Sequence, residues 1–502
     1  MENAPQSSSE PQGGSLGYQE AVSDFEGLLQ KEFKPQTDTR KTAVQQAIQT
    51  LAAQALSNVT LISGDALRTI ESMIAEIDRK LSEQLNQIIH HEDFKALEGT
   101  WRGLHHLVQN TETDETLKIR VFNISKKDLA KNLRQYKGVN WDQSPLFKKI
   151  YEEEFGTPGG SPFGCLVGDY QFDHTAGDVE LLTGISKIAA AAHAPFLSAA
   201  APSLMGMSSW QELSDPRDLT KILNTVEYAA WKSLRSSEDA KYLALTMPRF
   251  LARTPYGAKT SPVEEFAFEE DVEGGDHSKY VWSNAAYAMA ANITRSFKQF
   301  GWCASIRGSE SGGRVENLPT HSFPTDDGGV DMKCPTEISI TDRREAELAK
   351  NGLMPLSHWK NTDYAVFVGA QSLQKPAEYE NPEHTANARL AARLPYLFAT
   401  CRFAHYLKCI VRDKVGSFKS REDMHDMLHD WIVRNYVTTD DRADETTKAE
   451  KPLREARVEV EEVPGSPGYY SAKFWLRPHF QLEGLSVSLR LVSKLPSGKA
   501  NN

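Results

Sequence analysis

The sequence contains few cysteines and no C-x-x-C pair. Among 502 residues there are five cysteines: Cys165, Cys303, Cys334, Cys401 and Cys409. A small, odd number of cysteines without paired spacing is typical of reduced thiols and not of a disulfide framework. The cysteine content therefore does not indicate a small disulfide-rich secreted domain.

Long apolar runs are also missing. The most apolar stretch, residues 185–202, is mostly alanine and contains Lys187, His193 and Pro195, which does not fit a membrane-spanning helix. The first residues, Met1–Gln6, have neither the basic region nor the apolar region of an export signal. We therefore expect a cytoplasmic protein that does not insert into a membrane.

Positively charged residues are fewer than negatively charged ones. The chain has 57 Lys and Arg residues against 68 Asp and Glu residues, a formal net charge of -11. An acidic surface repels the phosphate backbone of nucleic acids, so a nucleic-acid partner is not expected.

Motifs that bind phosphates or metals are absent or weak. There is no Walker sequence, and the glycine-rich stretch Gly156–Gly164 lacks the Gly-Lys-Ser/Thr ending and precedes a predicted strand, which favours a loop. His425 and His429 have the i, i+4 spacing of metal ligands, with Asp426 and Asp430 beside them, but a solvated polar helix face explains the pattern equally. We expect no cofactor and no metal ion.

One polar cluster leaves an enzymatic hypothesis open. His321, Asp326 and Cys334 lie close together in the sequence, and a thiol beside a histidine can serve as a nucleophile. Pro335 follows Cys334, so no helix N-terminus is available to lower the thiol pKa, and turn formation explains the Pro, Asp and Gly content. The alternative kept here is a cytosolic thiol or histidine hydrolase using His321 and Cys334.

The remaining chain reads as a multi-domain α+β protein. Its length favours two or three domains. Predicted strands at Leu117–Phe122 and Phe163–Gly168 are followed by helices expected to open at Asp342 and Asn381, the second running to about Asp413. Strands and helices are interleaved without a repeating βαβ period, which indicates mixed α/β architecture.

Two helices are predicted near the N-terminus. Residues 1–60 form a polar tail and linker, within which Tyr18–Phe33 has the apolar spacing of an amphipathic helix. Residues 65–90 carry a near-heptad apolar seam from Leu67 to Ile88. This seam suits either a coiled coil with another chain or a surface helix on the domain core, and the pattern alone does not decide between them.

The C-terminal region combines a charged linker with a strand meander. Residues 438–451 are rich in charge and poor in apolar residues, which predicts a loose tether. Residues 456–493 contain three runs in which apolar and polar residues alternate, the signal of half-buried strands. An open meander leaves strand edges that its own body or another subunit must cover.

Several ordered blocks resemble a known family. They are Leu166–Phe172, Trp302–Gly308, Leu318–Asp327, Lys333–Ile338, Arg402–Lys408 and Leu476–Leu482. From about residue 18 to about residue 496, the chain resembles the large sheath subunit of the bacterial type VI secretion system (the TssC/VipB family), which is related to contractile phage tail sheath proteins. The resemblance implies a phage tail sheath-like α+β fold, with an N-terminal sheath domain at 61–375 and a C-terminal sheath domain at 376–502.

The resemblance also implies a structural function without catalysis. Members pair with a small sheath subunit (TssB/VipA-like) and stack with copies of themselves as a helical tube around an inner tube of Hcp-like hexameric rings, on a baseplate. The tube contracts to drive the inner tube and spike into a target cell, and a Clp-type AAA+ unfoldase recycles it in the bacterial cytoplasm. A non-contractile scaffold of similar fold is a further alternative.

Two groups of residues acquire roles from the resemblance. The helix read by the unfoldase corresponds to Phe25, Leu28, Leu29 and Phe33. Strand exchange between subunits corresponds to Val458, Val460, Tyr470, Phe474, Leu476, Val487, Leu489 and Leu491.

Overall fold

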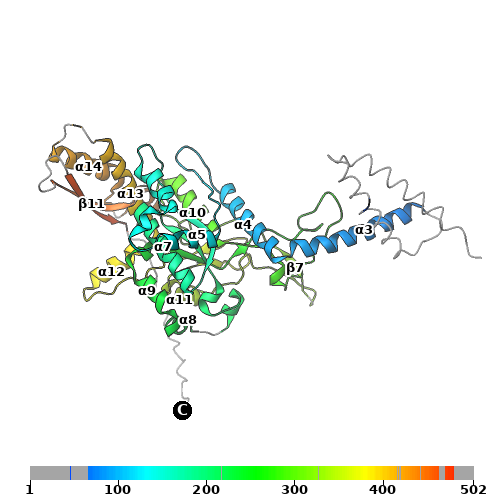
Figure 1. The fold of residues 1–502 in the computed structure, drawn as a ribbon. Coiled ribbons are helices and arrows are strands. Elements are labelled where there is room, and N and C mark those ends of the chain that lie inside the picture. The colour runs from blue at the N-terminus through cyan, green and yellow to red at the C-terminus, as the bar shows by residue number, and fades with distance from the viewer. Residues whose placement is uncertain are drawn as a thin grey trace, which may run out of the picture. The chain divides into compact units, whose positions relative to one another are not determined.

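A computed structural model describes Gln46 and residues 66–479, without 216–217, 326, 415–416, 418–419, 441 and 463–469 (Figure 1). The predicted helix Tyr18–Phe33 and the third predicted strand, with Val487, Leu489 and Leu491, lie outside these residues. The described residues form two compact units. The first contains residues 66–102, 251–283 and 319–335, and the second contains 103–250, 284–318 and 336–479. The boundary predicted between residues 375 and 376 stays a prediction.

The first unit is built on a long helix. Helix α3 spans Ala66–Ile89, which confirms the helix expected from the heptad pattern. Helix α4 (Glu92–Gln109) begins in this unit after a turn at His90 and His91, and its first turn carries Glu92 and Asp93, which suit the positive end of a helix dipole. The hairpin β7–β8 (Ser322–Pro324 and Val330–Met332) and the short helix η7 (His277–Lys279) belong to the same unit. Its small apolar cluster joins Leu251, Tyr280 and Trp282.

The second unit contains a six-stranded sheet of order β1-β2-β3-β9-β10-β6. Neighbouring strands from β1 to β9 are parallel, and β10 is antiparallel to both β9 and β6. Every residue of the central strands β2 and β3 is buried, as expected for a parallel sheet covered on both faces. The strands are β1 (Leu166–Phe172), β2 (Phe196–Ala200), β3 (Leu243–Met247), β9 (Leu353–His358), β10 (Ala365–Phe367) and β6 (Arg314–Val315).

Helices pack on this sheet through small side chains. Helices α7 (Ala176–Ala192) and α10 (Ala285–Phe300) both contact β2 and β3, and the buried Ala189 and Ala286 allow close approach. The largest apolar core of the chain lies here and includes Phe172, Trp210 and Trp231. Between residues 103 and 380, the other helices that the structure describes in this unit are α5 (Lys126–Gln135), η1 (Gly138–Gln143), α6 (Pro145–Phe147), the π-helix η2 (Lys148–Gly156), η3 (Pro202–Met205), η4 (Trp210–Ser214), α8 (Leu219–Leu223), η5 (Val226–Tyr228), α9 (Ala229–Ser236), η6 (Glu238–Tyr242) and α11 (Asp342–Lys350).

The C-terminal part of the second unit has its own apolar cluster. Helices α12 (Pro382–Ala391), α13 (Leu394–Asp413), α14 (Arg421–Tyr436) and α15 (Glu445–Glu450) precede the hairpin of β11 (Leu453–Glu462) and β12 (Tyr470–Pro478). A capping box between Ser420 and Asp423 starts α14. Phe403, Leu428, Ile432 and Val458 form the centre of the cluster, which places α13, α14 and β11 side by side (Figure 1).

Several local expectations were wrong. Residues 117–122 alternate like a strand but adopt no strand, since no neighbouring strand among the described residues pairs with them. The helix expected from Asn381 to Asp413 is broken at the extended residue Arg393, because Pro395 sits in the first turn of α13 and opposes continuation from the preceding helix. The strand expected at Phe163–Gly168 begins later, since β1 spans Leu166–Phe172. Helix α11 does begin at Asp342, as expected, with Thr341 as its cap.

Candidate functional site

The β11–β12 hairpin contains all of the predicted exchange residues that the structure describes. In its antiparallel register Val458 lies opposite Phe474, Val460 opposite Ala472, and Glu462 opposite Tyr470. Val458 and Val460 are buried, and Phe474 and Leu476 pack against the same cluster. The alternating pattern therefore correctly indicated strands with one apolar face.

The chain's own helices cover that apolar face. The cluster joins Val458 and Val460 to Leu428 and Ile432 of α14, so these side chains are not left for another subunit to bury. Of the two covers left open for the meander, the chain's own body supplies the one over this apolar face. Among the described residues, β11 and β12 pair with each other and with no third strand of a sheet. The outer backbone edges of the hairpin are therefore the part that another strand could pair with.

An apolar groove runs beside the hairpin. Its volume is about 270 Å³, and its lining comes from α13, α14 and the two strands: Leu407, Lys408, Val411, Met424, Leu428, Val460, Ala472 and Phe474. Aromatic rings stiffen the support beneath it, because Phe403 lies 4.5 Å from Trp302 between ring centroids and 5.6 Å from Tyr436. The groove is therefore a preformed surface beside a hairpin that pairs with no further strand of the described part of the chain.

The charged segment before the hairpin is partly folded. Helix α15 is capped by the Asp444 side chain, and Ala449 is buried. The N–H of Thr438 donates to the carbonyl of Leu453 at 3.0 Å, which ties the start of the segment to the start of β11. The expectation of a loose tether over 438–451 was wrong for these residues, since a capped helix and one buried side chain are enough to order them.

Helices α3 and α4 expose an apolar stripe in the first unit. Ile74, Leu81 and Ile88 recur every seven residues on α3 and are exposed. Phe94, Leu97 and Trp101 continue at spacings of three and four on α4, and Trp101 is 63% exposed. The three heptad residues Ile74, Leu81 and Ile88 thus face solvent in the single chain, as they would in a helix that awaits a partner.

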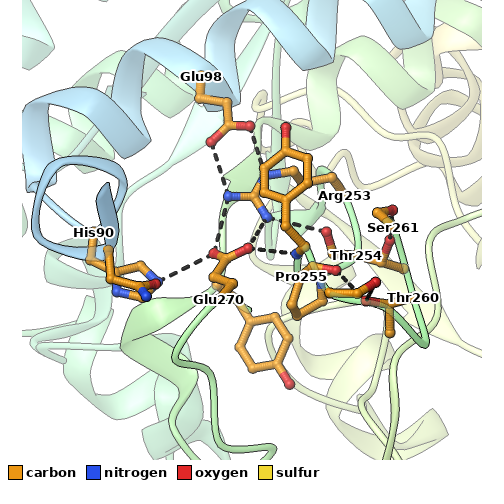
Figure 2. Close-up of polar contacts among 12 residues, drawn as sticks. His90, Glu98, Arg253, Thr254, Pro255, Thr260, Ser261 and Glu270 are labelled. Carbon is orange, nitrogen blue, oxygen red and sulfur yellow. Dashed lines mark hydrogen bonds and ion pairs between the residues drawn. The ribbon is translucent and has the colours of Figure 1, made fainter. Parts of the chain in front are cut away.

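Four charged or titratable side chains of the first unit, His90, Glu98, Arg253 and Glu270, lie close together (Figure 2). The side chains of Arg253 and Glu270 are 7% and 1% exposed. Arg253 also donates from Nε to Glu98 Oε1 at 2.7 Å, and His90 Nε2 lies 3.2 Å from Glu270 Oε1. The carboxylate of Glu270 further accepts the N–H of Tyr256 at 2.8 Å. Each carboxylate therefore has at least two donors, as a buried charge requires.

The cluster fixes the joint between α3 and α4 to the segment around Glu270. Asn86 in the last turn of α3 donates to the carbonyl of Glu269 at 3.1 Å and accepts the N–H of Asp271 at 2.9 Å. Burial by itself raises the pKa of Glu98, but hydrogen bonds and charges from Arg253 and Arg102 outweigh it and leave the pKa below its usual value. The charged groups of this cluster are hydrogen-bonded to one another. The arrangement therefore suits a structural role and not the binding of a substrate. Nothing in the sequence pattern pointed to it, because its members are far apart along the chain.

The enzymatic hypothesis gains no geometric support. The Nδ1 atom of His321 lies 2.7 Å from the hydroxyl of Tyr280, and burial lowers the pKa of the ring. Asp326 lies outside the described residues. Cys334, the thiol of this hypothesis, is half-buried. Burial raises the pKa of two other thiols, Cys303 and Cys401, to about 12, which makes those two poor nucleophiles.

His425 and His429, whose spacing would suit metal ligands, lie on α14 with their ring centroids 5.7 Å apart, and His425 contacts Asp426. In the described ranges no group of three or more His, Cys, Asp or Glu residues is arranged to hold a metal ion. Across the same ranges, no helix has the length and apolar character needed to cross a membrane.

Comparison with known proteins defines the class. Residues 71–374 match the family described as EvpB/VC_A0108, tail sheath N-terminal domain, and residues 383–495 match the EvpB/VC_A0108 tail sheath gpW/gp25-like domain. These matches define a tail sheath protein. The chain belongs to the EvpB/VC_A0108 family of tail sheath proteins, which confirms the resemblance and the sheath-like α+β fold expected from it.

One relative and two solved structures illustrate the similarity. The chain is 68% identical over 481 residues to the type VI secretion system sheath protein TssC1 of Pseudomonas aeruginosa, with 96% of each chain covered. A chain of the anti-feeding prophage baseplate shares 10% identity at a TM-score of 0.36, covering 76% of this chain and 84% of that one. The contracted helical sheath of the same prophage shares 12% identity at a TM-score of 0.31, covering 62% and 66%.

Proposed function

We propose that this chain is the large building block of the contractile sheath of a bacterial type VI secretion system and works in the cytoplasm. The observation that carries the proposal is the 68% identity to a type VI sheath protein across 96% of both chains. Two features of the fold support it: a hairpin with open backbone edges and an exposed heptad stripe. In this role the chain is a structural element and not an enzyme.

Assembly uses both features. The exposed stripe of α3, with Ile74, Leu81 and Ile88, packs against the small sheath subunit. The edges of the β11–β12 hairpin accept strands from neighbouring subunits, because strand addition supplies directional backbone hydrogen bonds and side-chain alternation sets the register. Val487, Leu489 and Leu491 of a neighbouring copy are the side chains proposed for the groove beside the hairpin.

The assembled heterodimers form a helical tube around an inner tube of hexameric rings on a baseplate. Contraction of this tube propels the inner tube and its spike into a target cell. The baseplate and inner tube are proposed partners by virtue of family membership, and no described surface is assigned to either.

Recycling is proposed to use Phe25, Leu28, Leu29 and Phe33, which lie outside the described residues. Burying such side chains yields about 1.5–3 kcal/mol each before ordering and association costs are subtracted. A single contact with a Clp-type AAA+ unfoldase is therefore weak, and many copies on one contracted sheath raise the avidity.

Co-expression with the small sheath subunit tests the proposal. The expected result is a co-purified complex that forms tubules visible by electron microscopy. A monodisperse monomer that ignores the small subunit would contradict it.

A separate variant tests recycling. Leu28→Asp combined with Leu29→Asp should leave tubules intact and weaken their binding to the unfoldase. Unchanged binding would place the recognition site elsewhere.

A further inference from the structure

Residues 117–124 have the sequence of a strand and no strand to pair with. Leu117, Ile119 and Val121 alternate with Lys118, Arg120 and Phe122. In the part of the chain that the structure describes, no backbone N–H or C=O from Lys118 to Asn123 has a hydrogen-bond partner. Alternating sequence and an unpaired backbone together mark an incomplete sheet edge.

The apolar side chains of this segment are unusually open. Val121 is 68% exposed and Phe122 is 55% exposed. Ile119, by contrast, packs against the cluster of Leu107 and Tyr287. One side of the segment is therefore attached to its own unit, while two large apolar side chains further along it have no cover among the described residues.

Contacts within the segment and just after it hold it in place. Arg120 pairs with Glu154 and lies over the ring of Phe163 at 5.6 Å. The hydroxyl of Tyr170 donates to the carbonyl of Ile124 at 2.8 Å, and Lys126 Nζ donates to the carbonyl of Gln171 at 2.6 Å. A segment that is already anchored loses less conformational entropy when a partner binds, so it is suited to strand addition.

The charges of the segment select the partner. Lys118 and Arg120 are both exposed and stand two residues apart, on one face of a strand. Arg120 already pairs with Glu154, and an identical segment from a second copy carries no acidic side chain for Lys118 and adds like charge, which disfavours that strand pair. A strand with acidic side chains at alternate positions pairs favourably instead.

We propose that residues 118–123 are a strand-acceptor site for an acidic, alternating β-strand of a different polypeptide. In the sheath, the partner is the small subunit, and the inference rests on the proposed function for that identification. Binding converts the unpaired backbone into a ladder and covers Val121 and Phe122. This contact is separate from the β11–β12 hairpin and from the stripe on α3.

Two proline variants test the backbone contact in co-expression with the small subunit. The N–H groups of adjacent residues point to opposite edges of a strand, so Val121→Pro or Phe122→Pro must remove a donor that faces the partner. Since the isolated chain pairs neither N–H, both variants should fold, as checked by limited proteolysis. At least one proline should abolish co-purification, while Val121→Ala and Phe122→Ala retain it. If both proline variants co-purify with the small subunit as well as their alanine controls do, the proposal is overturned.

Charge and hydrogen exchange complete the test. Lys118→Glu, which spares the Arg120–Glu154 pair, should weaken the complex about tenfold, whereas Lys131→Glu, at an exposed lysine on α5, should not. In the purified wild-type complex, the amides of residues 118–123 should exchange at least tenfold more slowly than in the isolated chain. A complex in which these amides stay fast overturns this inference alone. Absence of any wild-type complex overturns the proposed function together with it.

Discussion

Arg253 and Glu270 form a two-point ion pair inside the first unit. The Nη1 atom of Arg253 donates to Oε2 of Glu270 at 2.5 Å, and Nη2 donates to Oε1 at 3.1 Å. This fork-to-fork geometry is the strongest form of an arginine–carboxylate contact. Glu98 shares the guanidinium and also accepts from Arg102, so Arg253 links two carboxylates at the joint of α3 and α4 (Figure 2).

Replacing Arg253 with methionine should destabilise the first unit strongly. The buried carboxylate of Glu270 would lose its bidentate counter-charge, at a cost of roughly 3–5 kcal/mol, while Glu98 keeps its contact with Arg102. Arg102 provides the matched control because it contacts Glu98 from a position 36% exposed, and Arg102→Met should cost less than about 1 kcal/mol. Urea unfolding of the two variants measures which of them loses more stability. Equal losses would show that the buried pair contributes no more than the exposed one.

Lowering the pH below 6.5 should destabilise the second unit through His405. The ring is buried on α13, its Nε2 lies 2.9 Å from the carbonyl of Ala192, and burial lowers its pKa to about 4. Between this value and the ordinary pKa of about 6.5, the unfolded chain binds the proton and the folded chain does not. Stability is therefore complete above pH 6.5 and falls by at most about 1.4 kcal/mol per pH unit as the pH drops toward 4.

The variant His405→Gln isolates this contribution. Its urea midpoint should fall less steeply between pH 6.5 and 4 than that of the wild type, although His106, whose pKa burial also lowers to about 4, still titrates. Parallel curves for the two proteins would rule out His405 as a source of the pH dependence.

Acidic substitutions on the α3 stripe should abolish assembly without unfolding the chain. Ile74→Glu with Leu81→Glu changes exposed side chains, so the free energy of unfolding should move by no more than about 0.5 kcal/mol. Gln87→Glu adds the same kind of charge at an exposed position off the stripe and should assemble normally. Co-purification with the small subunit and tubule counts are the measurements. Normal tubules from the double variant would exclude the stripe from the interface.

Truncating Phe403 should loosen the cluster that supports the hairpin. This fully buried ring contacts Trp302, Trp431 and Tyr436, and Phe403→Ala should cost roughly 3–5 kcal/mol. Val411→Ala, at an exposed position of the same helix, should change stability by less than about 0.5 kcal/mol. The rate of amide hydrogen exchange in β11 and β12 should rise in Phe403→Ala and not in Val411→Ala. If the amides of both strands exchange as slowly in Phe403→Ala as in the wild type, the stability of the hairpin does not depend on this cluster.

Strand exchange is best tested by substituting residues that follow the hairpin in the sequence. Deleting Tyr469–Leu491 would remove Phe474 and Leu476 from the chain's own core, so lost tubules would not report on exchange. Val487→Asp, Leu489→Asp and Leu491→Asp together spare that core. We expect a folded protein that forms no tubules in electron micrographs. Tubules of normal length would mean that these residues take no part in exchange.

The periodic elements could be predicted from the sequence. The heptad seam placed α3, because residues seven apart lie on one helix face whatever surrounds them. Period-two alternation placed β11 and β12 for the same reason. The interleaving of such segments indicated α+β architecture, and ordered blocks of residues indicated the sheath family.

Contacts between distant segments could not be predicted. Glu98, Arg253 and Glu270 carry no shared pattern, yet the fold brings them within hydrogen-bonding distance. The alternating residues 117–122 show the opposite case: their pattern is that of a strand, but pairing needs a neighbour that this part of the chain does not supply.

Periodicity along a chain records which side chains share a face, because that depends on backbone geometry alone. By itself, the sequence determined that α3 has an apolar stripe and that β11 and β12 have apolar faces. Only the tertiary structure decided that α14 covers the faces of the hairpin while the stripe on α3 stays exposed. The physical reason is that burial depends on which other segment arrives at a surface, and residues that meet in space leave no common period in the sequence.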